Sequence, residues 1–174
     1  ARIYATGISA GGMMSQYFAC QTDRLAAFAT VAGSLSQTIA EGNPKHLPVA
    51  ALIIHGTSDP ILPYTGSKKS GMGKYHPRFF AAPDAAQWWA DQNGCKGDPA
   101  RTILPKLVPN DPTIVEKVQY PCSAEGETTF YSIQGGGHTW PGTDNWYPRF
   151  IVGPVSMQLD ATTVIWDFFK THRK

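Results

Sequence analysis

The sequence has little charge and no long hydrophobic run. Charged residues make up 16% of its 174 residues, and the formal net charge is only +2, which is too small to indicate a nucleic-acid partner. No stretch of about 18 apolar residues occurs, so we expect no membrane-spanning segment. With 42% apolar residues, the composition is that of an ordinary globular protein, and the length predicts one domain over residues 1–174.

The sequence also has few cysteines and lacks the paired Cys or His spacings typical of metal sites. We therefore expect neither a metal nor another cofactor. Of the three cysteines, Cys20 is assigned to the apolar face of a predicted helix, where it packs as a small hydrophobic residue. Cys95 and Cys122 lie in turn-like surroundings, where disulfides often join surface loops. If these two pair, the chain matured in an oxidising compartment and is secreted or periplasmic; two free thiols are the alternative.

Predicted strands alternate with predicted helices along the chain. Apolar runs predict strands over residues 2–6, 26–32, 49–54, 113–120 and 128–133. Helical spacing and helix-start signals predict helices over residues 11–21, 83–92 and from residue 159 or 160 to 170. The stretch over residues 60–83 has no clear period, which indicates a functional loop. The alternation predicts an α/β fold with a mainly parallel sheet and helices on both faces.

Residues 7–11, Gly-Ile-Ser-Ala-Gly, lie between the first predicted strand and the first predicted helix. This pattern is typical of a nucleophile elbow, in which a serine sits on a sharp, strained strand-to-helix turn. Small neighbours such as Gly7 and Gly11 are expected to let the strand and the helix pack closely. The N–H of Ala10 lies at the helix start, where it has no partner within the helix. We therefore predict Ser9 as the nucleophile and Ala10 as an oxyanion donor.

A serine nucleophile needs a base and an anionic group that orients the base. His138 follows a predicted strand and three glycines that allow close backbone approach, and we predict it as the base. Asp59 follows another predicted strand, and the order Ser, Asp, His is that of α/β hydrolases. Asp144 is the rival acid, because it lies in the same loop as His138. For His55 a structural hydrogen bond is expected instead of a catalytic role.

Three aromatic residues, Trp140, Trp146 and Tyr147, lie just after His138 in the sequence. Aromatic side chains beside a hydrolase nucleophile can line an acyl or aryl pocket, or stack on a sugar or phenolic ring. Large aromatic residues also pack in protein interiors, so both interpretations stay open. We predict a substrate-binding role for the three residues.

Three motifs carry a resemblance to a known family: GISAGGMM over residues 7–14, HGTSDPILPY over residues 55–64, and GGGHTWPG over residues 135–142. In this order they resemble the secreted polyhydroxybutyrate depolymerase and feruloyl esterase family of α/β hydrolases. The likeness extends from residue 3 to the last predicted helix. The resemblance implies that Ser9 is the nucleophile, Asp59 the acid and His138 the base. It also implies a disulfide between Cys95 and Cys122.

Members of this family carry several strands and helices before the elbow, including a loop that supplies a second oxyanion donor. The present sequence begins at the strand before the elbow, so the resemblance implies an α/β-hydrolase domain truncated at its N-terminus. Loss of one oxyanion donor typically lowers the rate by about two to three orders of magnitude. Missing strands would also leave an open sheet edge, which we expect a homodimer partner or a complementing chain to cover.

The resemblance implies a serine carboxylic ester hydrolase that acts through an acyl-serine intermediate. Its substrates are expected among feruloyl, other aryl or acetyl esters of plant polysaccharide, or polyesters of the polyhydroxybutyrate type. The abrupt start of the sequence leaves a second hypothesis open. In it, a catalytically weak fragment binds a polysaccharide or a partner through its aromatic loop and its open sheet edge.

Overall fold

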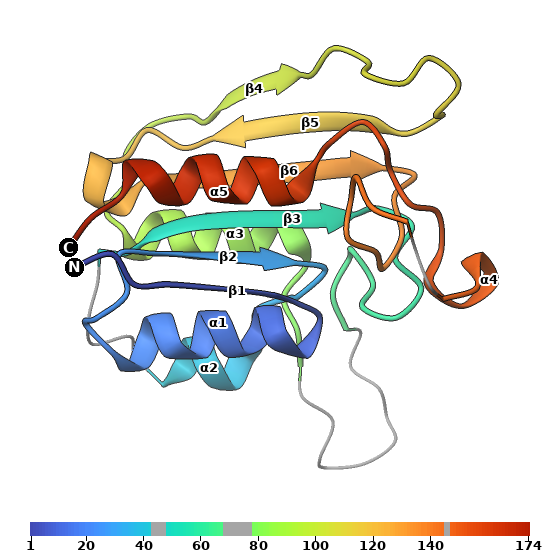
Figure 1. The fold of residues 1–174 in the computed structure, drawn as a ribbon. Coiled ribbons are helices and arrows are strands. Elements are labelled where there is room, and N and C mark those ends of the chain that lie inside the picture. Colours follow the sequence, from blue (N-terminus) through green and yellow to red (C-terminus); the bar gives the residue numbers. More distant parts are fainter. Residues whose placement is uncertain (43–47, 68–77, 145–146) are drawn as a thin grey trace.

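A six-stranded sheet forms the centre of the protein in a computed structural model that describes residues 1–42, 48–67, 78–144 and 147–174 (Figure 1). The sheet has the order β1-β2-β3-β6-β5-β4. Its strands are β1 Tyr4–Ile8, β2 Ala27–Val31, β3 Ala50–Gly56, β4 Ala100–Ile103, β5 Ile114–Gln119 and β6 Thr128–Gln134. The helices are α1 Ala10–Gln21, α2 Gln37–Glu41, α3 Ala82–Gln92, the 3-10 turn Ala124–Gly126, α4 Arg149–Val152 and α5 Ala161–Thr171.

The pairing of the strands confirms the predicted α/β class. β1, β2, β3 and β6 pair in parallel, whereas β6, β5 and β4 pair antiparallel at one edge. β2 and β3 are buried at every position, as continuous apolar runs predict for strands covered on both sides. The sheet is therefore mainly parallel, with an antiparallel edge that the sequence analysis did not specify.

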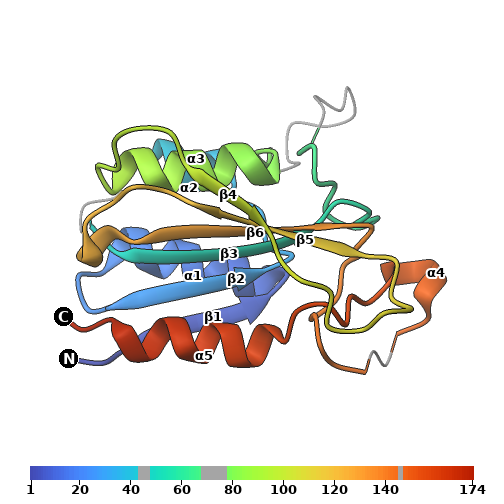
Figure 2. The same cartoon turned by 90° about the horizontal axis from the view of Figure 1, so that it is seen from above.

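Helices cover both faces of the sheet, as predicted (Figure 2). α1 and α3 lie on one face, where Phe28 and Trp89 belong to an apolar cluster and their ring centroids are 4.6 Å apart. α5 lies on the other face, where Leu52, Ile133 and Phe169 belong to a second cluster. Burial of apolar surface on both faces supplies the main stabilisation of such a layered fold.

Three short elements are missing from the prediction: α2, β4 and α4. The two helices have five and four residues, which is too short to show a helical period. All four residues of β4 are exposed, and this strand is defined by its pairing with β5. The long helix α3 begins at Ala82, one residue before the predicted start. Sequence periodicity therefore found the long elements and missed those fixed by distant contacts.

The large apolar side chains of α1 face solvent, whereas Cys20 is buried on the opposite side. The exposed fractions of Met14, Tyr17 and Phe18 are 50%, 44% and 48%. Cys20 is fully buried, and this burial raises the pKa of its thiol to about 12. Cys20 thus packs as a small hydrophobic residue, as predicted. The assignment of Cys20 to the helix face that carries the large apolar residues is wrong.

A disulfide joins Cys95 and Cys122, as the family resemblance implies. Cys95 follows α3, and Cys122 lies between β5 and β6. Next to it in the sequence, the buried amide of Asn93 bonds the backbone of Val49 and the hydroxyl of Thr128, at the starts of β3 and β6. These contacts hold the amino ends of the central strands to α3.

Candidate active site

Three parallel strands bring the predicted triad to one edge of the sheet. Ser9 follows β1 directly, Asp59 comes shortly after β3, and His138 comes shortly after β6. Because the four parallel strands pair in the order β1-β2-β3-β6, their carboxyl ends lie at the same side of the molecule (Figure 1). Ligands of open α/β sheets bind at this side.

Ser9 has the strained backbone of a nucleophile elbow. Its φ is 55° and its ψ is −122°, a conformation that residues other than glycine rarely adopt. A Cβ at Gly7 would lie 2.6 Å from the carbonyl carbon of Gly11, so no larger residue fits there. Gly11 itself has open space at its Cβ position. The predicted need for small residues on both sides is therefore correct for Gly7 and wrong for Gly11.

Ala10, the predicted oxyanion donor, is the first residue of α1 and is exposed. Its N–H has no acceptor within the helix, because the first four N–H groups of an α-helix lack intrahelical partners. The partial positive charge of the helix start adds to this polarity. The position therefore suits a developing negative charge beside Ser9.

Asp59 is fixed in a buried network. Its side chain has 0% exposure, and its Oδ2 lies 2.8 Å from Nδ1 of His138. Its Oδ1 accepts hydrogen bonds of 2.8 Å from the backbone N–H groups of Ile61 and Leu62. Such bonds hold a carboxylate in one orientation. Asp59 can therefore orient His138 and stabilise its protonated form.

The turns that carry the acid and the base are bonded to each other. Ser58 N–H donates to Gly136 O at 2.9 Å, and Gly135 N–H donates to the Thr57 hydroxyl at 2.9 Å. A Cβ at Gly56 would collide with the backbone of Gly136. Gly56 thus allows the close approach of the two turns, whereas Gly137, directly before His138, allows the backbone of Val152 and Gly153 to approach. The approach of the two turns sets the distance between Asp59 and His138.

His138 is held from the other side by the segment after α4. Its backbone N–H donates to Val152 O at 2.6 Å, and the N–H of Gly137 donates to Pro154 O at 2.7 Å. His138 and Ser9 line the same pocket. Within the described part of the chain, Ser9 Oγ and His138 form no hydrogen bond. In free hydrolases such a bond is often long and shortens with substrate.

His55 contacts the same carboxylate oxygen of Asp59 as His138 does. The ring is buried, its Nε2 lies 2.9 Å from Leu62 O, and the same atom lies 3.4 Å from Asp59 Oδ2. Burial lowers the pKa of His55, although Leu62 O and Asp59 act in the opposite direction. The neutral ring therefore donates its Nε2–H to the turn that holds Asp59. The expected structural hydrogen bond of His55 is present.

The pocket in front of the elbow has a volume of about 670 Å³ and a largely apolar wall. Its lining comprises Ile8, Ser9, Ile61, His138, Thr139, Trp140, Thr143, Asp144, Tyr147, Ile151 and Val152. Asp144, the rival acid, is exposed in this wall, whereas Asp59 holds the ring of His138. The isoleucines of the wall come from three distant segments and were missed by sequence reasoning, because only their spatial proximity marks them.

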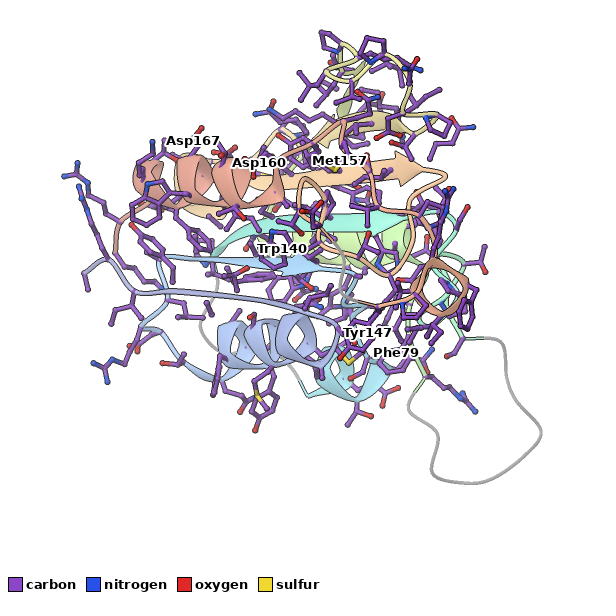
Figure 3. All side chains as sticks on the ribbon, turned by 45° about the vertical axis from the view of Figure 1, so that its right-hand side comes forward. Phe79, Trp140, Tyr147, Met157, Asp160 and Asp167 are labelled. Atoms are coloured by element: carbon purple, nitrogen blue, oxygen red, sulfur yellow. A yellow bond between two sulfur atoms is a disulfide. The ribbon has the colours of Figure 1, made fainter. Side chains whose placement is uncertain are left out.

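The three predicted aromatic residues have different surroundings. Trp140 is half-buried against the core, and its Nε1–H donates to Thr162 at the start of α5. Tyr147 is 68% exposed. Figure 3 shows Trp140 over the sheet below α5 and Tyr147 farther out, toward the loops. Both line the pocket, so Trp140 combines the packing and the pocket interpretations. Trp146 lies outside the described residues.

The described ranges hold neither a cluster of metal ligands nor a membrane-spanning helix. Among these residues, no group of three or more His, Cys, Asp or Glu side chains is arranged to hold a metal ion. In the same ranges, no helix has the length and apolar character needed to cross a membrane.

Comparison with known proteins points to esterases. The chain is 28% identical over 173 residues to "Putative esterase NocK" of Nocardia uniformis subsp. tsuyamanensis, which covers 95% of this chain and 50% of that protein. It is 32% identical over 140 residues to feruloyl esterase B of Piromyces equi, which covers 79% of this chain and 25% of that protein. It is also 43% identical over 63 residues to probable feruloyl esterase C of Aspergillus oryzae. This match covers 36% of this chain and 23% of that protein. No family model matches the chain.

These matches confirm the predicted relationship to feruloyl esterases. The chain spans at most half the length of the curated relatives it matches. The relationship also agrees with the observed mainly parallel sheet and with the elbow between β1 and α1.

Proposed function

The chain is a relative of esterases, feruloyl esterases among them, and on that premise we propose that it hydrolyses carboxylic esters through an acyl-serine intermediate. The observation that carries the proposal is the buried 2.8 Å contact between His138 Nδ1 and Asp59 Oδ2, beside a pocket that Ser9 also lines. The strained backbone of Ser9 adds support, because strain of this kind is found at functional sites.

Each residue of the proposed triad has one role in the reaction. Asp59 accepts the Nδ1–H of His138, which leaves Nε2 to take the proton of Ser9 Oγ. The serine oxygen bonds to the ester carbonyl carbon, and the N–H of Ala10 donates to the resulting oxyanion. His138 then gives its proton to the leaving alcohol, while the acyl group stays on Ser9. A water molecule, deprotonated by His138, attacks the acyl-serine; the carboxylic acid leaves and Ser9 regains its proton.

The apolar wall of the pocket supports an aryl or other apolar acyl group. Ile8, Ile61 and Ile151 give aliphatic surface, and Trp140 gives a ring face. Apolar and aromatic walls with few polar groups are typical of small-molecule sites. Feruloyl and other aryl esters therefore come first among the proposed substrates, before acetyl esters and hydroxybutyrate oligomers.

Reaction with a fluorophosphonate tests the triad without knowledge of the substrate. The intact mass of the protein should show one adduct, and the adduct should be absent in Ser9→Ala. Turnover of methyl ferulate, aryl acetates and hydroxybutyrate oligomers then ranks the acyl groups. A folded protein without adduct and without turnover of any of these esters would contradict the proposal.

The edge of the sheet at β1 supports a further proposal, that another β-strand covers it. Among the strands that the structure describes, β1 pairs with β2 alone, and Ile3 and Ile8 beside this edge are 38% and 36% exposed. With the exposed apolar residues of α1, they form a surface typical of an interaction site. A homodimer partner or a complementing chain would supply the strand. The molar mass in solution tests the first source, because a dimer is expected and a monomer would exclude it.

A second candidate function is binding without catalysis, favoured by the exposed aromatic residue Tyr147 beside the pocket. Affinity of the wild type for insoluble polysaccharide, retained in Ser9→Ala and without hydrolysis, would support it. The Cys95–Cys122 disulfide supports maturation in an oxidising compartment, so we place the protein outside the cytosol, secreted or periplasmic.

A further inference from the structure

Tyr147 lines the catalytic pocket and also a second hollow of about 600 Å³. The second hollow lies between the connection from β4 to β5 and the segment that follows His138. Its wall has apolar side chains together with the amide of Asn110 and the guanidinium of Arg149. Because Tyr147 lines both hollows, they are neighbours. A substrate longer than the first hollow can therefore reach the second.

One wall of this hollow is irregular backbone held by a buried amide. Gln158 is 3% exposed. Its Oε1 accepts hydrogen bonds from the N–H groups of Leu107 and Val108, and its Nε2 donates to the carbonyl groups of Val108 and Asp111. These four bonds satisfy the amide and fix the connection between β4 and β5. The wall is therefore preorganised.

The carboxylate of Asp111, which lines the hollow, accepts hydrogen bonds on both of its oxygens from within the chain. Asp111 Oδ1 accepts from the N–H and hydroxyl of Thr113 at 2.8 and 2.7 Å, and its Oδ2 accepts from the N–H of Met157 at 2.5 Å. Burial alone would raise the pKa of Asp111, but the bonds from Thr113 and Met157 hold it below its ordinary value. Asp111 is thus a fixed structural carboxylate, with no part in the proposed triad.

Arg149 is exposed at the start of α4 and lines the hollow. Its guanidinium forms no ion pair or hydrogen bond with any residue that the structure describes. Asp111 keeps its negative charge, but its oxygens are bonded to Thr113 and Met157 and the charge of Lys106 acts on it. The positive charge of Arg149 is therefore left for a ligand in the hollow. A guanidinium binds a carboxylate through two parallel hydrogen bonds, which gives both affinity and geometric selection.

We propose that this hollow is a subsite for a carboxylate-bearing sugar unit on the alcohol side of the ester, with Arg149 as the residue that selects it. The inference rests on the proposed esterase function. The catalytic pocket is apolar and takes the acyl group, so the sugar that carries the ester extends past Tyr147. Its ring packs on Tyr147, its hydroxyl groups reach Asn110, and its carboxylate pairs with Arg149.

Two acetyl ester substrates of equal length test the subsite, one on an oligogalacturonide and one on a neutral xylo-oligosaccharide. We expect the wild type to prefer the uronate ester, and Arg149→Gln to lower kcat/KM for that ester about ten- to hundredfold, mainly through KM. Its activity on the neutral ester should be unchanged. The preference should also weaken in about 1 M salt, because the Debye length falls to about 3 Å and the attraction between the two charges is screened.

Arg101→Gln is the matched control, because Arg101 lies on β4 and pairs with Glu116 at 3.3 Å. It should leave both substrates unaffected. Equal turnover of both esters by the wild type, or equal losses on both in Arg149→Gln, would overturn the subsite while leaving the esterase proposal intact. A calorimetric titration of Ser9→Ala with trigalacturonate and xylotriose tests binding even without turnover. Absence of a preference for the uronate there would also overturn the subsite.

The contacts of His55 carry a second, independent inference. Oδ1 of Asp59 is held by two backbone N–H groups, and Oδ2 by His138 at 2.8 Å and His55 at 3.4 Å. We infer that His55 is a positioning residue, which shares its Nε2–H between Leu62 O and Asp59 and so fixes the carboxylate for His138. The titratable groups facing His55 in the described part of the chain are Asp59, His138 and Tyr64, whose ring centroid is 6.1 Å away.

His55→Leu and His55→Gln distinguish positioning from packing. Leucine removes the donor, and kcat should fall about tenfold with little change in KM. The ascending limb of kcat/KM should move to higher pH, because more negative charge stays on Asp59 and favours protonated His138. Glutamine retains an N–H donor and should restore both values in part. Equal effects of the two variants, or an unchanged pH limb in folded His55→Leu, would overturn the role.

Discussion

The two ends of the parallel strands each hold a histidine paired with a carboxylate, and the two pairs differ in their surroundings. At the carboxyl ends, His138 Nδ1 lies 2.8 Å from Asp59 Oδ2, and within the described residues its other ring nitrogen has no hydrogen-bond partner. At the amino ends, His172 Nε2 lies 3.3 Å from Glu127 Oε2, and its Nδ1 lies 2.7 Å from Phe168 O.

The number of acceptors around each ring explains the difference in role. Burial lowers the pKa of His172, but the contacts with Glu127 and Phe168 O outweigh it, so the pKa is raised. Acceptors on both nitrogens favour the protonated form of the ring, and in that form the His172–Glu127 pair is an ionic clamp. A ring with one nitrogen unbound can accept a proton from a neighbour. The same chemical pair therefore suits proton transfer at one end and stability at the other.

Replacing each histidine by alanine should give the largest difference in kcat between the two pairs. His138→Ala removes the proposed base, and kcat for an aryl ester should fall on the order of 10⁵-fold with the fold retained. His172→Ala should leave kcat within about twofold at a temperature where the protein is folded, because the ring lies at the opposite end of the sheet. Steady-state kinetics and circular dichroism on both variants measure the two effects. Similar kinetic losses in both would contradict the assignment of roles.

The carboxylates should show the same contrast with a smaller effect. Asp59→Asn presents an amide to His138, which no longer fixes the productive tautomer, and kcat should fall about 10⁴-fold. Glu127→Gln is the matched change at the other end, and we expect no kinetic effect. A pH series of kcat for both variants provides the measurement. A loss below about tenfold in Asp59→Asn would favour Asp144 as the acid.

Much of the fold and the triad could be predicted because the signals are local. A strand end followed by Ser9, Asp59 or His138 is visible in the sequence, and parallel strands bring such ends together. The short strand β4 and the helices α2 and α4 gave no such signal, since four or five residues carry no period.

The walls of the two hollows could not be predicted for a different reason. Ile8, Ile61 and Ile151 belong to separate segments and meet only in the folded chain. The role of Gln158 depends on contacts about 50 residues away in the sequence. The exposure of Phe18 on α1 could not be predicted either, because apolar spacing shows a helical face and not what covers it.

The disulfide at the amino ends offers a test of stability of intermediate size. Cys95→Ser with Cys122→Ser opens a loop of 27 residues, which should lower the free energy of unfolding by about 3 kcal/mol. Urea unfolding measures the change, and the kinetics of the folded variant should stay near those of the wild type. Cys20→Ala is the control for loss of a thiol. A kinetic loss comparable to that of Asp59→Asn would contradict the division between the two ends.

The smallest effect is expected from the pH dependence of the His172 clamp. The pKa of His172 is raised above its ordinary 6.5, so its contribution is complete below that pH and is lost as the pH rises through the raised pKa. The contact with His172 lowers the pKa of Glu127 below its ordinary 4.5, so that contribution is lost as the pH falls through the lowered pKa. The clamp between His172 and Glu127 therefore contributes most to the stability of the folded protein between pH 4.5 and 6.5.

His172→Gln should accordingly lower the free energy of unfolding by about 1 kcal/mol near pH 5.5 and by less near pH 9. Urea unfolding of both proteins at the two pH values gives this difference directly. Glu127→Gln should behave in the same way, since either change removes the same ionic contact. If the difference grew toward high pH, the ring would be neutral in the folded protein. His172 would then no longer contrast with His138 by its charge.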